Sequence, residues 1–300
     1  MTKPLDDVAG MIRNARVLGA DETQAMRRAV WPDGMISAVE AGILFELNHA
    51  SLSPSVEWVD FFVEAITAFV VEQAEPRGYV SDENAAWLMQ RIDHDGRVDT
   101  LAELELLVRL IERADNVPDD LKAYVLVQIK RAVLTGEGPT RHGDSLTPGR
   151  IGTAEVRLLR RVLYAAGGHA PAHISAAEAE LLFAIKDATV HGDNAPEWQT
   201  LFVQALSLHI LTDPVYQALH RDEAARLNAF MADTSSSVGG FIGRMAASVG
   251  KAAPQAPRKT VAKRNTAVSE RKQDWLQAMI DSDGKLDPLE RALLKALAEG

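Results

Sequence analysis

The chain has 300 residues, of which 47% are apolar and 25% are charged, with a net charge of −10 and no cysteine. Such a composition is typical of globular proteins, and the length suits two medium-sized domains that each bury a core. The lack of cysteine excludes disulfides, thiolate zinc sites and a cysteine nucleophile. Because the sequence contains no signal-like or membrane-spanning apolar run, a cytoplasmic location is expected.

Apolar residues recur at spacings of three and four along nearly the whole chain, as in LELLVRLIERA at Leu104–Ala114. This spacing is the period of an amphipathic helix, and strand-like alternation is nearly absent. The sequence therefore predicts an all-α fold. The expected helices cover about residues 20–30, 37–48, 55–73, 81–91, 100–114, 119–134, 153–166, 175–188, 196–211, 214–232, 268–280 and 288–298.

Four of these helices are expected to begin with a capping box. In this motif a small polar N-cap residue and an acid three positions later each accept a hydrogen bond from the other's backbone N–H. The predicted pairs are Ser37 with Glu40, Thr100 with Glu103, Ser175 with Glu178, and Asp287 with Glu290. The apolar residue before three of these caps is expected to pack as a hydrophobic staple. These residues are Ile36, Ile174 and Leu286.

A unit of about 140 residues occurs twice in the sequence. ISAVEAGILF at Ile36–Phe45 matches ISAAEAELLF at Ile174–Phe183, and EWVDFFVEA at Glu57–Ala65 matches EWQTLFVQA at Glu197–Ala205. The tryptophans of the second pair, Trp58 and Trp198, are expected to pack in the core, since large aromatic side chains dominate core burial. A third pair breaks the register, because its members lie 188 residues apart. They are WLMQRIDHDGRVD at Trp87–Asp99 and WLQAMIDSDGKLD at Trp275–Asp287.

The expected architecture is a pair of tandem duplicated helical domains of about 140 residues, the second interrupted by a flexible basic insert. An N-terminal segment covers residues 1–14 and the first repeat covers 15–140. The second repeat covers 141–233 plus 273–300, and the insert covers 234–272. The insert is rich in Gly, Ala, Ser and Pro and carries eight basic residues against one acid, whereas the rest of the chain is strongly acidic.

Three interpretations of the insert remain open: a solvated linker, a membrane-binding arm, or an arm for an acidic partner. Attachment to an anionic membrane surface would combine a short apolar cluster with basic side chains. The candidate residues are Phe241, Ile242, Met245, Lys259, Lys263 and Arg264. The absence of interleaved aromatic residues, together with the acidic body, argues against nucleic acid.

An acidic turn of the form D-x-D-G precedes one helix in each copy, and it resembles a calcium-binding EF-hand loop. Hard divalent cations need several oxygen ligands from a sharply turned loop, so Ca²⁺ or Mg²⁺ is the expected cofactor. Arg91 and Met279 occupy the first ligand position and cannot ligate. The alternative is an ordinary helix–helix turn, in which Gly96 and Gly284 supply a positive φ. The candidate ligands are Asp93, Asp95, Asp99 and Glu103 in the first copy, and Asp281, Asp283, Asp287 and Glu290 in the second.

The pattern of these turns resembles the tellurite-resistance TerB family. The matching segments are DGRVD at Asp95–Asp99, DSDGKLDPLE at Asp281–Glu290 and, more loosely, PDGMISAVE at Pro32–Glu40. The resemblance implies an all-helical, non-enzymatic module that binds divalent cations and acts in stress or envelope-associated complexes.

No catalytic set emerges from the sequence. His169 and His173 are four residues apart, but Pro171 and the glycines before them predict a loop with no third zinc ligand nearby. There is no nucleophile elbow, P-loop or dinucleotide fingerprint. The expected function is therefore a non-enzymatic helical scaffold or regulatory interaction module with a protein partner. The alternatives are a calcium- or magnesium-responsive sensor and a peripheral membrane adaptor attached through the insert.

Overall fold

The computed structural model describes residues 9–10, 18–31, 34–51, 54–93, 95–140, 147–165, 174–211, 271–281 and 284–299. In this part of the chain the regular secondary structure is helical, apart from one isolated parallel bridge between Tyr79 and Asn116. The predicted all-α fold is confirmed. None of the helices in the described ranges is long and apolar enough to cross a membrane.

The chain divides into two compact units. Unit 1 comprises residues 1–128, 138–144 and 166–168, and unit 2 comprises residues 129–137, 145–165 and 169–300. The helices of unit 1 are α2 (Ala20–Val30), α3 (Ala38–Ala50), α4 (Val56–Thr67), the π-helical turn η1 (Ala68–Gln73), α5 (Asp82–Ile92) and α6 (Leu101–Arg113). Helix α7 (Asp119–Thr135) begins in unit 1 and ends in unit 2. Unit 2 contains α8 (Thr153–Leu163), α9 (Ala176–Thr189), α10 (Glu197–Leu211), a helix over residues 271–280, and α14 (Pro288–Glu299).

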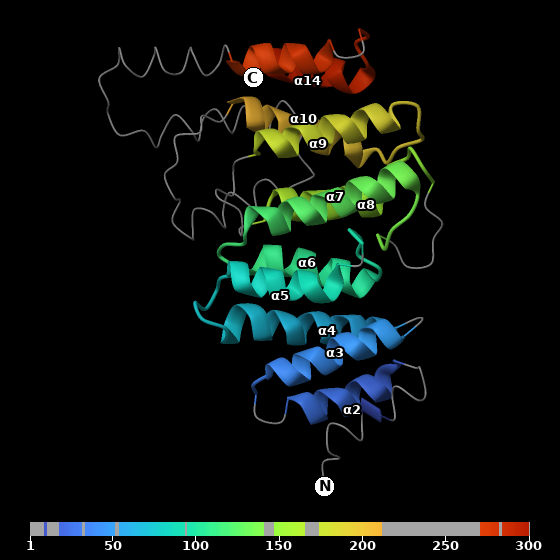
Figure 1. Cartoon of the computed structure of the whole chain (residues 1–300). Helices are drawn as coiled ribbons and strands as arrows, with labels where there is room; N and C mark the ends of the chain where they lie inside the picture. Colours follow the sequence, from blue (N-terminus) through green and yellow to red (C-terminus); the bar gives the residue numbers. More distant parts are fainter. Residues whose placement is uncertain are drawn as a thin grey trace, which may run out of the picture. The chain divides into compact units, whose positions relative to one another are not determined.

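One helix lies at the centre of each unit (Figure 1). In unit 1, α4 contacts α2, α3 and α6, and in unit 2, α10 contacts α8, α9 and α14. Both central helices are apolar on several faces, and each carries one of the two repeated tryptophans. The Trp58 side chain is fully buried and Trp198 is 1% exposed. The predicted core role of these two residues is therefore confirmed, and burial of such large side chains stabilises the helix contacts around them.

A second aromatic cluster joins α5 to the core of unit 1. Trp87 lies between Phe45 and Phe69, with ring centroids 5.7 Å and 5.3 Å away. Phe45 also packs edge-on against Phe62 of α4 at 5.1 Å. Aromatic pairs at these distances are favourable beyond the area they bury, so the cluster holds α5 against α3 and η1.

The same arrangement occurs in unit 2 around the helix at residues 271–280. Trp275 lies between Phe183 and His209, with ring centroids 5.8 Å and 4.8 Å away. Phe183 packs edge-on against Phe202 of α10 at 5.4 Å. The tryptophan of the helix at 271–280 therefore packs between two rings, as that of α5 does in unit 1, although 59 residues of the sequence separate this helix from α10.

All four predicted capping boxes are confirmed. In each, the backbone N–H of the N-cap residue donates to the acid, and the backbone N–H of the acid donates to the N-cap side chain. Glu22 and Glu155 make half of the same motif, since each accepts from the backbone N–H of a glycine N-cap, Gly19 and Gly152. These bonds satisfy backbone donors that a helix N-terminus otherwise leaves unpaired.

One predicted hydrophobic staple is wrong. Ile36 and Ile174 are buried, as expected, but Leu286 is 39% exposed. A staple needs an apolar residue five positions after the staple residue. In unit 2 that position holds Arg291, whose guanidinium donates to the Leu286 carbonyl oxygen at 2.9 Å instead.

The single helix predicted over residues 55–73 is α4 followed by the wider turn η1. In η1 the backbone N–H of Ala74 donates to the carbonyl oxygen of Phe69, five residues earlier, at 3.2 Å. A π-turn of this kind rotates the residues that follow it relative to a regular α-helix. The Gln73 side chain then accepts from the backbone N–H of Ile36 at 2.9 Å, which ties the end of η1 to the start of α3.

Candidate functional site

The acidic turn of unit 1 connects α5 to α6. Asp93 is the C-cap residue of α5, and its carboxylate accepts a hydrogen bond from the Tyr124 hydroxyl at 3.0 Å. Asp95 and Gly96 have φ values of 56° and 80°, the left-handed conformation that glycine adopts at no cost. The Gln128 amide donates to the Gly96 carbonyl oxygen at 3.0 Å, and Asp99 is exposed like Asp95. The turn geometry predicted for Gly96 is confirmed.

The acidic turn of unit 2 has the same glycine conformation, with Gly284 at a φ of 68°. Asp281 is exposed and accepts from the Gln277 side chain at 2.8 Å. Asp283, together with His169 and His173, lies outside the described residues. In the described ranges no three His, Cys, Asp or Glu side chains converge so as to hold a metal ion. Of the remaining predicted ligands, Asp287 and Glu290 come together, but around the ammonium group of Lys186.

Two of the predicted ligands, Glu103 and Glu290, are instead the most buried acids of their turns. Neither side chain is exposed to solvent. Each is the N3 residue of its capping box, so one carboxylate oxygen accepts from the N-cap backbone N–H. A buried carboxylate must be hydrogen-bonded or paired with a positive charge. The remaining oxygen of each glutamate therefore needs a partner, and the two units supply different ones.

In unit 1 the partners of Glu103 come from the last turn of α3. His49 Nε2 lies 2.6 Å from Glu103 Oε1, and the side-chain amide of Asn48 donates to the same oxygen at 3.5 Å and to the Thr100 hydroxyl at 3.1 Å. Asn48 is fully buried, and its own oxygen accepts from Trp58 Nε1 at 3.2 Å. One connected network therefore joins α3, α4 and α6.

The hydrogen bond to Glu103 raises the pKa of His49, burial opposes this rise, and the charges of Glu103 and Asp99 add to it. A histidine whose folded-state pKa is raised stabilises the fold below its unfolded pKa of about 6.5, and this stabilisation is lost as the pH rises through the folded-state pKa. We therefore expect the contact between α3 and α6 to weaken from about pH 6.5 upward.

This pH dependence can be measured by denaturing the wild type and the His49→Gln variant between about pH 5.5 and pH 8.5. The wild type should lose stability relative to the variant as the pH rises, because the other histidines titrate in both proteins and cancel in the difference. A constant difference across the series would contradict the predicted His49–Glu103 ion pair.

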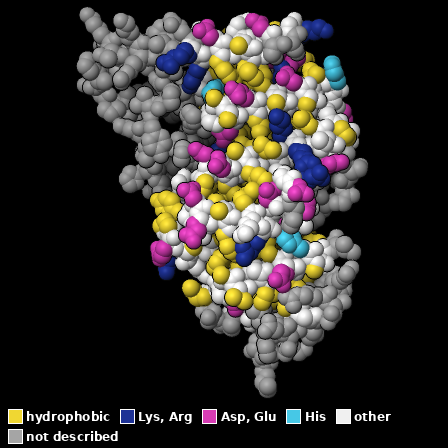
Figure 2. Space-filling view, in the orientation of Figure 1, with side chains coloured by type: hydrophobic (Ala, Val, Ile, Leu, Met, Phe, Trp, Pro, Cys, Tyr) yellow, Lys and Arg dark blue, Asp and Glu magenta, His cyan; other side chains and the backbone are white. Residues whose placement is uncertain are grey.

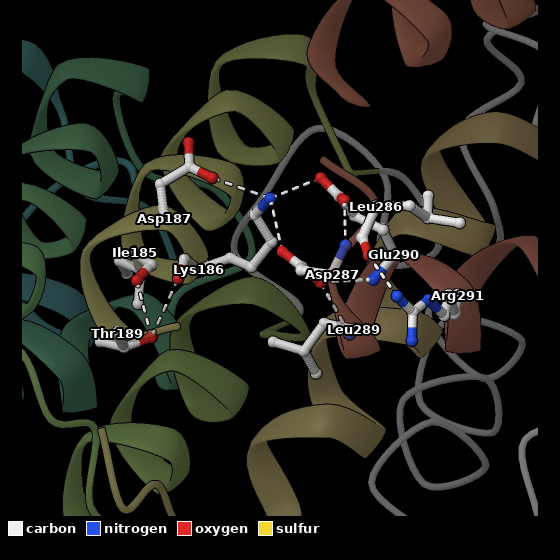
Figure 3. A network of polar contacts seen from close by, with 9 residues as sticks. All are labelled: Ile185, Lys186, Asp187, Thr189, Leu286, Asp287, Leu289, Glu290 and Arg291. Atoms are coloured by element: carbon white, nitrogen blue, oxygen red, sulfur yellow. Dashed lines mark hydrogen bonds and ion pairs between the residues drawn. The ribbon is translucent and has the colours of Figure 1, made fainter. Parts of the chain in front are cut away.

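In unit 2 the partner of Glu290 is Lys186, near the end of α9 (Figure 3). Lys186 Nζ lies 2.5 Å from Glu290 Oε1 and 2.9 Å from Asp287 Oδ2, and it also contacts Asp187 at 2.8 Å. The lysine side chain is only 1% exposed. Burial lowers the pKa of Lys186, but the hydrogen bonds that Lys186 donates to Asp187, Asp287 and Glu290 outweigh it and raise the pKa above the ordinary lysine value. Lys186 is therefore positively charged at neutral pH, the ordinary state of a lysine.

The lysine also changes the surroundings of the second tryptophan. Trp58 Nε1 donates to Asn48, but Trp198 Nε1 is buried and has no hydrogen-bond partner among the described residues. Because Lys186 has no acceptor atom, it cannot replace the asparagine oxygen. Among the described residues, the indole N–H of Trp198 therefore lacks the partner that the indole N–H of Trp58 has in unit 1.

Sequence reasoning missed Asn48, His49 and Lys186. The repeated segments continue past the residues first matched, so that ELNHA at 46–50 aligns with AIKDA at 184–188. Asn48 lies three and four residues after Phe45 and Leu44, on the apolar face of the helix, and Lys186 holds the same position. The available signal was a polar residue on the apolar face of the helix, at a position where the two copies carry different side chains.

Two matching polar clusters thus lie at the N-termini of α6 and α14. At each place a buried glutamate anchors one helix to another. No family model matches this chain, and no curated protein or solved structure matches it either.

Proposed function

We propose that the protein is a non-enzymatic helical interaction module built from two copies of one unit, of the kind that its TerB-like turns indicate. The observation that carries this proposal is the recurrence of the buried contacts. Trp–Phe pairs, a central helix and a buried N3 glutamate that contacts an earlier helix are found in both units. What the two units share among the described residues is a packing framework, and this supports the scaffold.

A further matched contact supports the duplication. In unit 1 Arg27 of α2 pairs with Glu64 of α4, and in unit 2 Arg160 of α8 donates to the side-chain oxygen of Gln204 of α10. Each arginine also lies over an aromatic ring, Arg27 over Phe61 at 5.0 Å and Arg160 over Tyr164 at 5.7 Å. The two units thus use the same arginine position to join the first helix to the central one.

The surface supports binding of a protein partner. On the face in Figure 2 acidic, basic and apolar side chains are intermixed over the described residues. Large apolar side chains that are more than half exposed include Met35, Val39, Val56 and Val127. Mixed surfaces of this kind suit recognition of another protein. We place the protein in the cytoplasm, with its basic insert as a candidate second attachment point.

The cation sensor is the main alternative, because the exposed carboxylates of Asp95 and Asp99 flank a sharp glycine turn. The membrane adaptor is the other. Its proposed residues, Phe241, Ile242, Met245, Lys259, Lys263 and Arg264, all lie outside the described residues, so it is supported by sequence alone.

Thermal unfolding of the full chain in calcium, magnesium and excess chelator separates the scaffold from the sensor. A ligand that binds only the folded state must raise the melting temperature, by an amount equivalent to about 2.7 kcal/mol when its concentration is a hundredfold above Kd. For the scaffold we expect equal melting temperatures with chelator and with about 1 mM of either cation.

The matched control is the Asp93→Asn/Asp281→Asn variant, which removes one carboxylate from each turn and leaves both buried glutamates unchanged. If calcium or magnesium stabilised the wild type and not this variant, the acidic turns would bind the cation and the protein would be a sensor. Equal stabilisation of both proteins would indicate cation binding elsewhere on the acidic body.

A further inference from the structure

One buried position that is equivalent in the two units carries chemically different side chains. Asn48 and Lys186 are both fully or almost fully buried near the end of the helix that the repeated motif begins. Each contacts the N3 glutamate of a later helix, Glu103 in unit 1 and Glu290 in unit 2. The neighbouring residue differs as well, since His49 corresponds to Asp187.

The N-cap residue differs in the corresponding way. Thr100 caps α6 with a neutral hydroxyl, whereas Asp287 caps α14 with a carboxylate that is 8% exposed. Unit 2 therefore buries two carboxylates, Asp287 and Glu290, against one ammonium group. Unit 1 buries one carboxylate against an amide and a histidine. Two buried carboxylates without a cation would be strongly unfavourable, so the acidic N-terminus of α14 requires the lysine.

The apolar contacts cannot make this distinction. Trp87 and Trp275 each pack between two rings at centroid distances that differ by at most 0.5 Å between the units. A helix pair that carries either tryptophan therefore meets two rings at similar distances, on α3 and η1 in unit 1 or on α9 and α10 in unit 2. Polar positions tell the two surfaces apart: Lys186 stands where unit 1 has Asn48, and the ring of His209 stands where unit 1 has Phe69.

We infer that Lys186 is a specificity residue. It makes the surface formed by α9 and α10 a docking site for a helix pair whose second helix begins with two carboxylates, which in this chain is residues 271–299. The equivalent surface of unit 1, with Asn48 in place of the lysine, rejects that pair because it would leave a carboxylate buried without a cation. This inference rests on the duplication proposed above.

The test replaces residues of unit 2 with those at the equivalent positions of unit 1 in the full chain. The measurement is the backbone hydrogen exchange of residues 288–296. Lys186→Asn alone should accelerate this exchange at least about tenfold, because it leaves Asp287 and Glu290 buried without a cation. Adding Asp187→His and Asp287→Thr copies the complete arrangement of unit 1 and should restore slow exchange. Lys130→Asn, a half-buried helix lysine of the same unit, is the control and should leave the rate unchanged.

Unchanged exchange in Lys186→Asn would overturn the inference, because the aromatic contacts alone would then direct docking. Fast exchange that the triple variant does not restore would also overturn it, since Lys186 would then be structural without being specific. Hydrogen exchange in α8 is measured in the same experiment. Faster exchange in α14 alone indicates release of α14, whereas faster exchange in both helices indicates unfolding of the whole unit.

The reverse exchange in unit 1 is independent of the folding of unit 2. Thr100→Asp alone should accelerate exchange in α6, because a second buried carboxylate would face Asn48, and Asn48→Lys combined with Thr100→Asp should restore it. Equal rates of hydrogen exchange in α6 for Thr100→Asp and for Asn48→Lys combined with Thr100→Asp would contradict the inference. Thermal unfolding with calcium or magnesium tests a different property, because its control variant changes none of the residues that are replaced here.

Discussion

Replacing Trp58 with alanine is expected to lower the free energy of unfolding of unit 1 by about 3–5 kcal/mol, the usual cost of removing a fully buried aromatic side chain. Trp58 packs at 5.9 Å from Phe61 and at 6.5 Å from Phe62, so the cavity would open in the first turn of α4. The loss should appear as a lower midpoint in chemical denaturation, with α6 and α2 becoming less protected from hydrogen exchange because both contact α4.

A pair of phenylalanine variants separates packing from hydrogen bonding at this position. Trp58→Phe removes the donor to Asn48 and leaves a buried oxygen unpaired, at a cost of about 1–3 kcal/mol beyond the lost volume. Trp198→Phe removes an N–H that has no partner among the described residues, so it avoids this additional cost. Equal destabilisation by the two variants would contradict the different roles assigned to the two tryptophans.

Replacing Glu103 with alanine is expected to destabilise unit 1 by about 2–4 kcal/mol. The estimate combines the lost cap of α6 with the buried donors that remain unpaired, chiefly the Asn48 amide. Glu103→Gln should cost less, because a glutamine oxygen can still accept from the Thr100 backbone N–H. Both variants should also abolish the pH dependence assigned to His49, because the hydrogen bond to the Glu103 carboxylate is its largest cause.

Denaturation of both variants at pH 6 and pH 8 measures these effects, with Arg109→Ala as the control. Arg109 lies on the exposed face of the same helix, so its replacement should change stability by less than about 0.5 kcal/mol. If Glu103→Ala were no worse than this control, the buried glutamate would not anchor α6, and the candidate site of unit 1 would lose its structural basis.

Helix positions and helix starts were predictable from the sequence because both are local properties. The capping boxes at Ser37, Thr100, Ser175 and Asp287 all formed, since the two residues that bond each other are only three positions apart. The staple at Leu286 failed for an equally local reason, because the position that should complete it holds Arg291. The π-turn η1 was not predictable, since its sequence continues the helical pattern of α4 without a break.

The candidate site could be predicted only in part. The sequence singled out Glu103, Asp287 and Glu290 because acids cluster around a D-x-D-G turn, and the structure buries these three residues. Their partners were invisible, because Asn48 and Lys186 lie 55 and 104 residues away from the glutamates that they contact. A motif search reads neighbours along the chain, whereas a buried carboxylate takes its partner from whichever helix packs against it.

By itself, the sequence determined the helical class, the positions at which helices start and the residues that two segments of the chain have in common. Periodicity, capping and glycine turns act over three or four residues, so they need no tertiary information. The tertiary structure alone decided which acids are exposed and which are buried, and which cation or amide faces each buried one. Burial removes water as a partner, so the role of each acid depends on the helix packed against it rather than on the turn that carries it.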